Sequence, residues 1–141
     1  MIKRNRKLEF FSLTVLLVCL LSLFGCKSIK NENGWYYVAD NQTKELSEKP
    51  FMTTDDIAKA SVEKDEAGNK VILLKLKKEG IKKLEDATEA YKGKYIAFLC
   101  NDSIVSMVLV NEKISSEFIY VTNSDEELLL KTYKTLKVSI K

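Results

Sequence analysis

The chain has 141 residues, which is enough for one domain and a short extension. Its formal net charge is +3, but residues 1–25 hold four of the 23 basic residues and one of the 20 acids, so the remainder is neutral with 19 of each. All 19 of these basic residues are lysines. Nucleic-acid-binding domains usually have a basic surplus that includes arginine, so nucleic acid is not an expected partner.

Residues 1–25 have the organisation of an export signal. A basic head is followed by an apolar run at 10–24, which is too short for a comfortable membrane span. The run ends at Gly25-Cys26, and this pattern resembles the signal of bacterial lipoproteins, in which the cysteine is lipidated and becomes the mature N-terminus. An uncleaved signal anchor is the alternative.

The lipoprotein interpretation divides the chain into three parts. We expect residues 1–25 to be a signal peptide, Cys26 to carry acyl chains such as palmitate, and residues 26–33 to be a polar tether. Residues 34–141 would then form one domain, held at the periplasmic face of a membrane or at the cell surface. Of the other cysteines, Cys19 lies in the signal, so the mature domain can form no internal disulfide, and Cys100 is expected to be a buried apolar residue.

The first half of the predicted domain contains three strands and one short helix. Aromatic and β-branched residues predict a strand at 34–39, and a polar loop follows at 40–50. Thr53 can cap a helix whose first turn contains Asp55 and Asp56, so a short helix is predicted at 54–60. Further strands are predicted at 60–66 and 70–77, joined by a turn at 67–69.

The second half begins with the most regular helical pattern, at 78–91. Its apolar stripe consists of Ile81, Leu84, Ala87, Thr88 and Tyr91, and Gly93 is placed to end it. Strands are predicted at 94–100, 103–110 and 117–122, the first two joined by a tight turn at Asn101-Asp102. A capping box at Ser124–Glu127 predicts a last helix with Leu129, Tyr133 and Leu136 on one face.

The predicted order is therefore β-α-β-β-α-β-β-β-α. Short connections between strands favour antiparallel pairing, so the expected class is α+β, a mostly antiparallel sheet with helices packed on one face.

The elements from Ile57 to Leu129 resemble the first periplasmic head subdomain of SecD, the accessory subunit of the bacterial preprotein translocase. The matching segments are Ile57-Ala58-Lys59-Ala60, Val71 to Leu76, Glu79-Gly80, Lys82-Lys83-Leu84, Thr88, Gly93-Lys94, Ile96 to Leu99, Ser103 to Ser106 and Ser124 to Glu127. The chain departs from the family at Asn101-Asp102, where Asp-Gly is usual, and at Ser106-Met107-Val108, where Ser-Ala-Pro is usual. The resemblance implies the fold and contact with polypeptide outside the cytoplasm, but not energy-driven export.

Residue content argues against an enzyme. The mature part has no histidine and no arginine, which excludes Ser-His-Asp and Cys-His arrangements and histidine metal sites. It has no glycine-rich phosphate loop, and no acidic loop is dense enough for calcium, so we expect no cofactor and no metal. The paired carboxylates lie at Asp55-Asp56, Asp65-Glu66 and Glu126-Glu127, and helix capping explains two of these pairs.

Three functional hypotheses follow. The first is a lipid-anchored, non-catalytic module that binds protein or peptide, with Trp35, Tyr36 and Tyr37 as weak candidates for an exposed contact patch and an open sheet edge as a second means of contact. A strand with one face in the core explains the same three aromatics. The second is a structural or regulatory subunit of an envelope complex, and the third is an unrecognised hydrolase.

Overall fold

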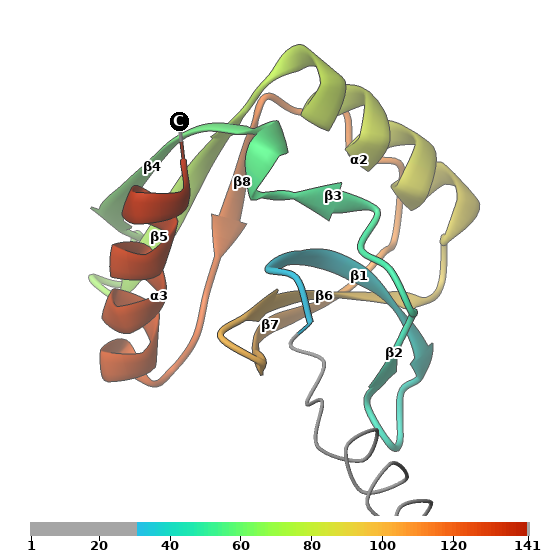
Figure 1. Cartoon of the computed structure of the whole chain (residues 1–141), viewed down its shortest axis with the longest axis horizontal. Helices are drawn as coiled ribbons and strands as arrows, with labels where there is room; N and C mark the ends of the chain where they lie inside the picture. The colour runs from blue at the N-terminus through green and yellow to red at the C-terminus, as the bar shows by residue number, and fades with distance from the viewer. Residues whose placement is uncertain (1–30, 141) are drawn as a thin grey trace, which may run out of the picture. The chain divides into compact units, whose positions relative to one another are not determined.

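The computed structural model describes residues 31–140, which contain eight strands, two α-helices and one 3-10 turn (Figure 1). The strands are β1 Gly34–Asp40, β2 Glu45–Leu46, β3 Met52–Thr53, β4 Ile57–Lys64, β5 Lys70–Leu76, β6 Tyr95–Cys100, β7 Ser103–Leu109 and β8 Phe118–Val121. The helical elements are η1 Thr54–Asp56, α2 Lys78–Ala90 and α3 Glu126–Ser139. The α+β class is confirmed.

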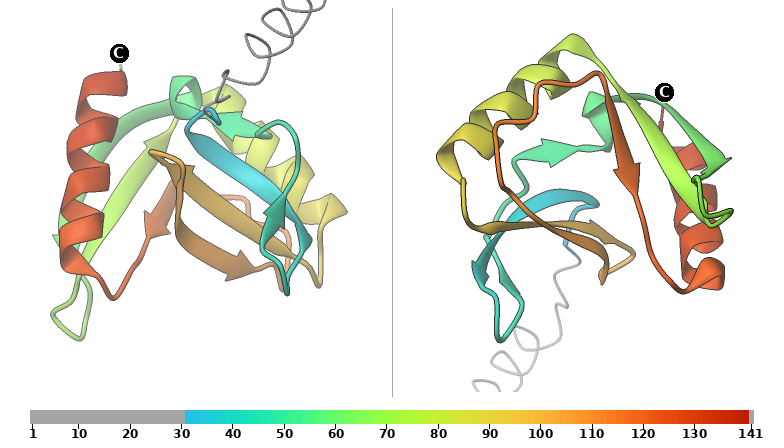
Figure 2. Two further views of the ribbon diagram at one scale, coloured as in Figure 1. Left: turned by 60° about the horizontal axis from the view of Figure 1, so that its bottom comes forward. Right: turned by 180° about the vertical axis from the view of Figure 1, so that it is seen from behind.

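The strands form two sheets, and every pair of neighbours is antiparallel. One sheet has the order β2-β1-β6-β7, with β3 also paired to β1, and the other has the order β4-β5-β8. Figure 2 shows α3 alongside the second sheet, where it contacts β4 and β5, while α2 contacts β3, β5 and η1. The antiparallel strands and helices agree with the class expected from the element order, but the strands are divided between two sheets where one was expected.

The division into two sheets has a cause in the segment between β7 and β8. The hydroxyl of Thr88 on α2 accepts a hydrogen bond from the backbone N–H of Ile114 (2.8 Å), and Ser115 donates to Glu85 Oε1 (2.6 Å). These contacts hold residues 110–117 against α2. Because the chain first crosses to α2, β8 joins β5 and not the free edge of β7.

The strand predictions are confirmed where the apolar pattern is strong. Strand β6 lies between β1 and β7 and is buried on both faces, as its continuous apolar run predicted. The β6–β7 turn places Asn101 and Asp102 at φ of 52° and 60°, the left-handed geometry of a two-residue hairpin. Cys100 is buried, as predicted.

The predicted helix at 54–60 is wrong beyond its first turn. Thr53 and Asp56 do form a capping box, but the 3-10 turn ends at Asp56 and β4 begins at Ile57. Residues 57–64 pair along β5, and Ile57 is 1% exposed, so burial in the sheet overrides the local helix signal. The predicted loop at 40–50 also contains the short strand β2, and β3 follows it.

Helix α2 agrees with the predicted range to within one residue. Its stripe buries Leu84, Ala87 and Thr88, and Gly93, at φ of 79°, follows its end. Gly80 lies so close to η1 that a Cβ there would be 2.7 Å from the carbonyl oxygen of Asp56. Beside it, the buried carboxylate of Asp56 accepts hydrogen bonds from Lys83 Nζ (3.0 and 3.1 Å). Together these contacts fix the start of α2 against η1.

Helix α3 begins one residue later than the predicted box implies. Its N-cap is Asp125, which accepts a hydrogen bond from the N–H of Leu128, and not Ser124. The predicted apolar face is present, with Leu129 and Leu136 fully buried and Tyr133 half-buried. Among residues 31–140, no helix is long and apolar enough to cross a membrane.

One apolar core joins both sheets and both helices. It includes Trp35 and Phe98 from the first sheet, Leu74 from the second, Leu84 from α2 and Leu129 from α3. The rings of Trp35 and Phe98 are tilted, with centroids 5.3 Å apart. All of these side chains come from the described residues, so this part of the chain holds a complete core.

Candidate functional site

An apolar groove of about 220 Å³ opens where the two sheets approach each other. Its lining residues come from six separate segments and are Trp35, Leu84, Ile96, Val108, Ile114, Phe118, Ile119 and Tyr120. Two of the lining residues, Phe118 and Tyr120, are 46% and 58% exposed. Exposed aromatic side chains next to an apolar hollow are typical of surfaces that bind other polypeptides.

Trp35, one of the residues that line the groove, has a buried hydrogen-bond donor. Trp35 is 3% exposed, and its indole N–H has no hydrogen-bond partner among the described residues. Buried polar groups are nearly always paired, and an unpaired one costs about 1–3 kcal/mol. A ligand carbonyl that reached this N–H would remove that cost.

Two open sheet edges accompany the groove. Strands β7 and β8 are each the last strand of their sheet, and Val108 and Ile119 place both on the groove wall. The Leu76 N–H donates to the Glu117 carbonyl (2.8 Å), so these two residues form a hydrogen-bonded pair of the β5–β8 ladder. Hydrogen-bonded and non-hydrogen-bonded pairs alternate along an antiparallel ladder. The N–H and C=O groups of Phe118 and Tyr120 therefore point away from β5. The Ser116 hydroxyl accepts a hydrogen bond from the N–H of Phe118 and donates one to its C=O. Among the described residues, the N–H and C=O of Tyr120 remain unpaired on this edge.

The three aromatics singled out from the sequence do not form an exposed patch. Trp35 and Tyr36 are buried, and Tyr37 is half-buried between Phe51 and Tyr91, with ring centroids 4.8 and 4.1 Å away. Burial raises the pKa of Tyr36 and of Tyr37, with smaller contributions from neighbouring groups. Of the three, Trp35 alone lines the groove.

Sequence reasoning did not single out Phe118 and Tyr120. They alternate with Ile119 and Val121 in a strand that is apolar on both faces, so the period of two does not tell which face is exposed. Their aromatic character was the available signal.

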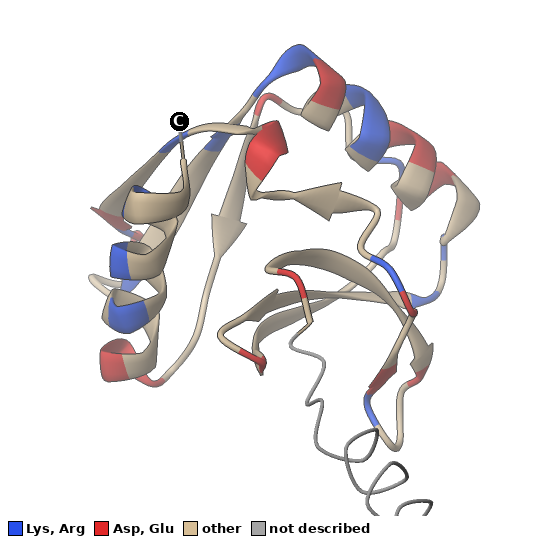
Figure 3. Ribbon diagram, in the orientation of Figure 1, with Lys and Arg blue, Asp and Glu red and all other residues tan. Residues whose placement is uncertain are grey.

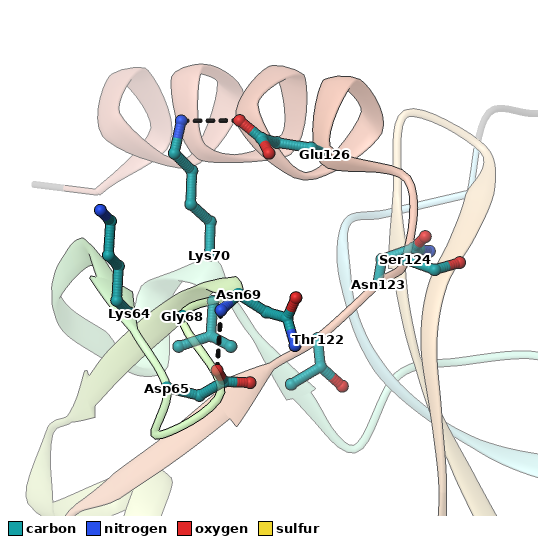
Figure 4. A pocket seen from close by; sticks show the side chains of 10 residues that line it. Lys64, Asp65, Gly68, Asn69, Lys70, Thr122, Asn123, Ser124 and Glu126 are labelled. Atoms are coloured by element: carbon teal, nitrogen blue, oxygen red, sulfur yellow. Dashed lines mark hydrogen bonds and ion pairs between the residues drawn. The ribbon is translucent and has the colours of Figure 1, made fainter.

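A larger hollow of about 630 Å³ lies between the β4–β5 turn and the start of α3 (Figure 4). It is polar, and three of its four charged groups have partners: Lys70 Nζ lies 2.6 Å from Glu126 Oε1, and Asp65 Oδ1 accepts from the backbone N–H of Asn69 (2.8 Å). Most of its charged groups are therefore engaged in an ion pair or a turn contact.

One member of each carboxylate pair named from the sequence has a structural partner. Asp56 bonds Lys83 and the N–H of Thr53, Asp65 closes the β4–β5 turn, and Glu126 pairs with Lys70. Burial raises the pKa of the Cys100 thiol, which favours the unreactive protonated form. Among residues 31–140, no group of three or more acidic, histidine or cysteine side chains is placed to hold a metal ion.

The residues of the predicted lipoprotein signal, including Cys26, lie outside the described residues. The last part of the predicted tether lies within them and contacts the domain. The Asn31 N–H donates to Asp102 Oδ1 (3.0 Å), and Asn33 Oδ1 accepts from the N–H of Asn101 (3.0 Å).

Fold and groove together define a small α+β domain with an apolar groove at its surface. Residues 32–128 match the family described as SecDF, P1 head subdomain, and the chain belongs to this family. A comparison with curated proteins finds no match.

Solved structures give the same fold. The chain matches a structure of SecDF, described as a membrane component that enhances protein export, with 23% identity and a TM-score of 0.61 over 70% of this chain and 44% of that one. It matches SecDF in a super-membrane-facing form equally well, over 13% of that longer chain. SecDF from Thermus thermophilus, a translocon-associated membrane protein, matches at 20% identity with a TM-score of 0.52, over 70% of this chain and 14% of that one.

The chain thus spans less than half the length of these SecDF chains. At this level of identity the structural matches establish the fold, and they agree with the family match over nearly the whole described region.

Proposed function

We propose that this protein is a lipid-anchored, extracytoplasmic module that binds an extended polypeptide segment in the groove between β7 and β8 and performs no catalysis. Cys26 carries the anchor. The bound segment adds to the open edge of β8 while its apolar side chains enter the groove. The SecDF relatives are described as enhancing protein export, which fits a polypeptide ligand.

One observation carries the proposal: Trp35, whose buried indole N–H has no partner among the described residues, lines the same groove as the half-exposed Phe118 and Tyr120. The two aromatic side chains supply contact area and lose little conformational entropy on binding, and a hydrogen bond from the Trp35 N–H would orient the ligand. An extended peptide offers both the carbonyl oxygens and the alternating apolar side chains that such a site requires.

The test uses Phe118→Ser together with Tyr120→Ser in the chain from residue 26 onward. Both side chains are about half exposed, so the fold should be retained while the groove loses its aromatic rings. We expect binding of a reduced, unfolded polypeptide, measured by fluorescence anisotropy, to weaken by about tenfold or more.

The control removes exposed apolar groups elsewhere, at Leu109 (41% exposed) and Val138 (86% exposed), through Leu109→Ser and Val138→Ser. These changes should leave binding unchanged. An equal loss in both double variants would show general stickiness, and binding unchanged in the groove variant would exclude the groove.

The lipid anchor has a separate test. Replacing Cys26 by Ser should abolish acylation and signal processing, as measured by incorporation of labelled palmitate and by the mass of the product. Unchanged acylation and maturation would exclude Cys26 as the lipid site, without bearing on the groove.

The alternative, a subunit of an envelope complex, predicts one fixed partner at constant stoichiometry after purification from detergent-solubilised envelope. A binding module should instead co-purify with many different polypeptides and with no fixed partner.

A further inference from the structure

We infer that the outward face of α3 is a second contact surface, which rests on the anionic headgroups of the membrane that holds the N-terminal anchor. This surface consists of Lys131, Lys134, Lys137 and Val138, and we call it the α3 lysine face. The inference rests on the anchoring part of the proposed function and is independent of the polypeptide groove.

Charge is concentrated on this face. From Lys131 to Ile140 the chain contains three lysines and no acid, although residues 26–141 are neutral overall. Figure 3 shows these lysines in blue along α3, with red confined to its start. Lys131 and Lys134 have no ion-pair partner among residues 31–140, whereas Lys70, Lys75 and Lys83 each have one.

The geometry of α3 turns these charges outward. Leu129 and Leu136 are fully buried on the core side of the helix, and helical spacing places Lys131, Lys134 and Val138 on the opposite side. Val138 is 86% exposed, an unusual position for an apolar side chain within a row of lysines. Lysines beside a protruding apolar side chain suit a headgroup layer, which attracts the charges and accommodates the apolar group.

The face lies next to the point where the N-terminal segment leaves the domain. Asn101 connects the two regions: its backbone N–H bonds Asn33 Oδ1, and its side-chain amide bonds Thr135 Oγ1 on α3 (both 3.0 Å).

Distance then favours membrane contact. From Cys26 to Asn33 the chain reaches at most about 25–30 Å when fully extended. A lipid on Cys26 therefore keeps Asn33, and with it Thr135, near the bilayer surface. Lys27 and Lys30 add two charges to the connecting segment. Because each lysine near an anionic surface strengthens binding about fivefold, the face would select one orientation of the anchored domain.

The experiment supplies the anchor chemically, so that it does not depend on cellular lipidation. Residues 26–141 are coupled through Cys26 to a maleimide lipid in vesicles; Cys100 is buried and should not react. Every variant carries Val138→Trp as a fluorescent probe. Brominated lipid quenches the fluorescence of this tryptophan on contact. The chain without the substitution gives the background fluorescence of Trp35. One set of vesicles contains about one-third phosphatidylglycerol in phosphatidylcholine, and the other contains phosphatidylcholine alone.

We expect quenching with phosphatidylglycerol, little with phosphatidylcholine, and loss of quenching at about 0.5 M salt. Replacing Lys131, Lys134 and Lys137 by Gln should reduce the membrane-facing population about fivefold for each lysine. The matched control replaces Lys59, Lys64 and Lys113, which are exposed elsewhere, and should leave quenching unchanged. Equal quenching on both lipids, or an equal response to both triple variants, would overturn the inference.

Discussion

The two hollows of the domain differ in a way that size does not predict. The polar hollow beside the β4–β5 turn is almost three times larger, but Lys70 and Glu126 pair across it and Asp65 bonds the turn. The apolar groove is smaller, but it is lined by the half-exposed Phe118 and Tyr120 and by Trp35, whose buried indole N–H has no partner among the described residues. Unpaired polar groups and exposed apolar side chains therefore identify a binding site better than the volume of a hollow does.

The hollows also differ in what they are made from. The groove shares Trp35, Leu84 and Ile96 with the hydrophobic core, so its shape depends on how the sheets and α2 pack. The polar hollow is lined mainly by turn and loop residues at the surface. Substitutions of the core residues that line the groove should therefore affect stability strongly, and substitutions at the polar hollow weakly. The first and last of the three predictions below test this difference, and the second tests the packing of α2 on η1.

The largest effect is expected at the floor of the groove. Leu84 is 1% exposed, and Leu84→Ala should lower the free energy of unfolding by about 2–5 kcal/mol, because it removes buried methyl groups and leaves a cavity. Urea denaturation would measure the change. Exposed Glu79→Ala on the same helix is the control and should change stability by less than about 0.5 kcal/mol. A small effect of Leu84→Ala would mean that the groove is not part of the core.

An intermediate effect is expected where α2 meets η1. A methyl group at Gly80 would lie 2.7 Å from the Asp56 carbonyl oxygen, so Gly80→Ala should destabilise the domain by about 1–3 kcal/mol even though alanine favours helix formation. Thermal unfolding would measure the change. A stability gain of about 1 kcal/mol, the amount expected from helix propensity alone, would contradict the close packing of α2 on η1.

The smallest effect is expected at the polar hollow. Lys70 and Glu126 are 38% and 60% exposed at their side chains, so Glu126→Gln should cost less than about 1 kcal/mol, and the difference should shrink in high salt. Urea denaturation at low and high salt would measure it. A loss as large as that for Leu84→Ala would remove the distinction between the two hollows.

The sequence predicted the regular elements well where one face of each had to be buried. Strand β6 and helix α2 were placed to within one residue, since a continuous apolar run and an apolar stripe each fit a single type of element. The helix expected at 54–60 failed because the capping signal of Thr53 and Asp56 is local, whereas strand pairing from Ile57 onward is a long-range contact.

The candidate site was only partly predictable. Trp35 was named for its aromatic character, but its neighbours in the groove are distant in sequence and are brought together by the packing of α2 between the two sheets. Phe118 and Tyr120 carried no pattern that distinguished them from Ile119 and Val121. Which face of the strand is exposed depends on what packs against the sheet, and that is a property of the assembled fold.

The sequence by itself determined the family resemblance, the neutral charge of the chain after residue 25 and most of the helix and strand positions, because these follow from residue type and local period. The tertiary structure decided that the strands form two sheets, that β8 leaves β7 for β5, and that a groove opens between them. The physical reason is the attachment of residues 110–117 to Thr88 and Glu85 on α2, contacts between segments about 30 residues apart that no local pattern encodes.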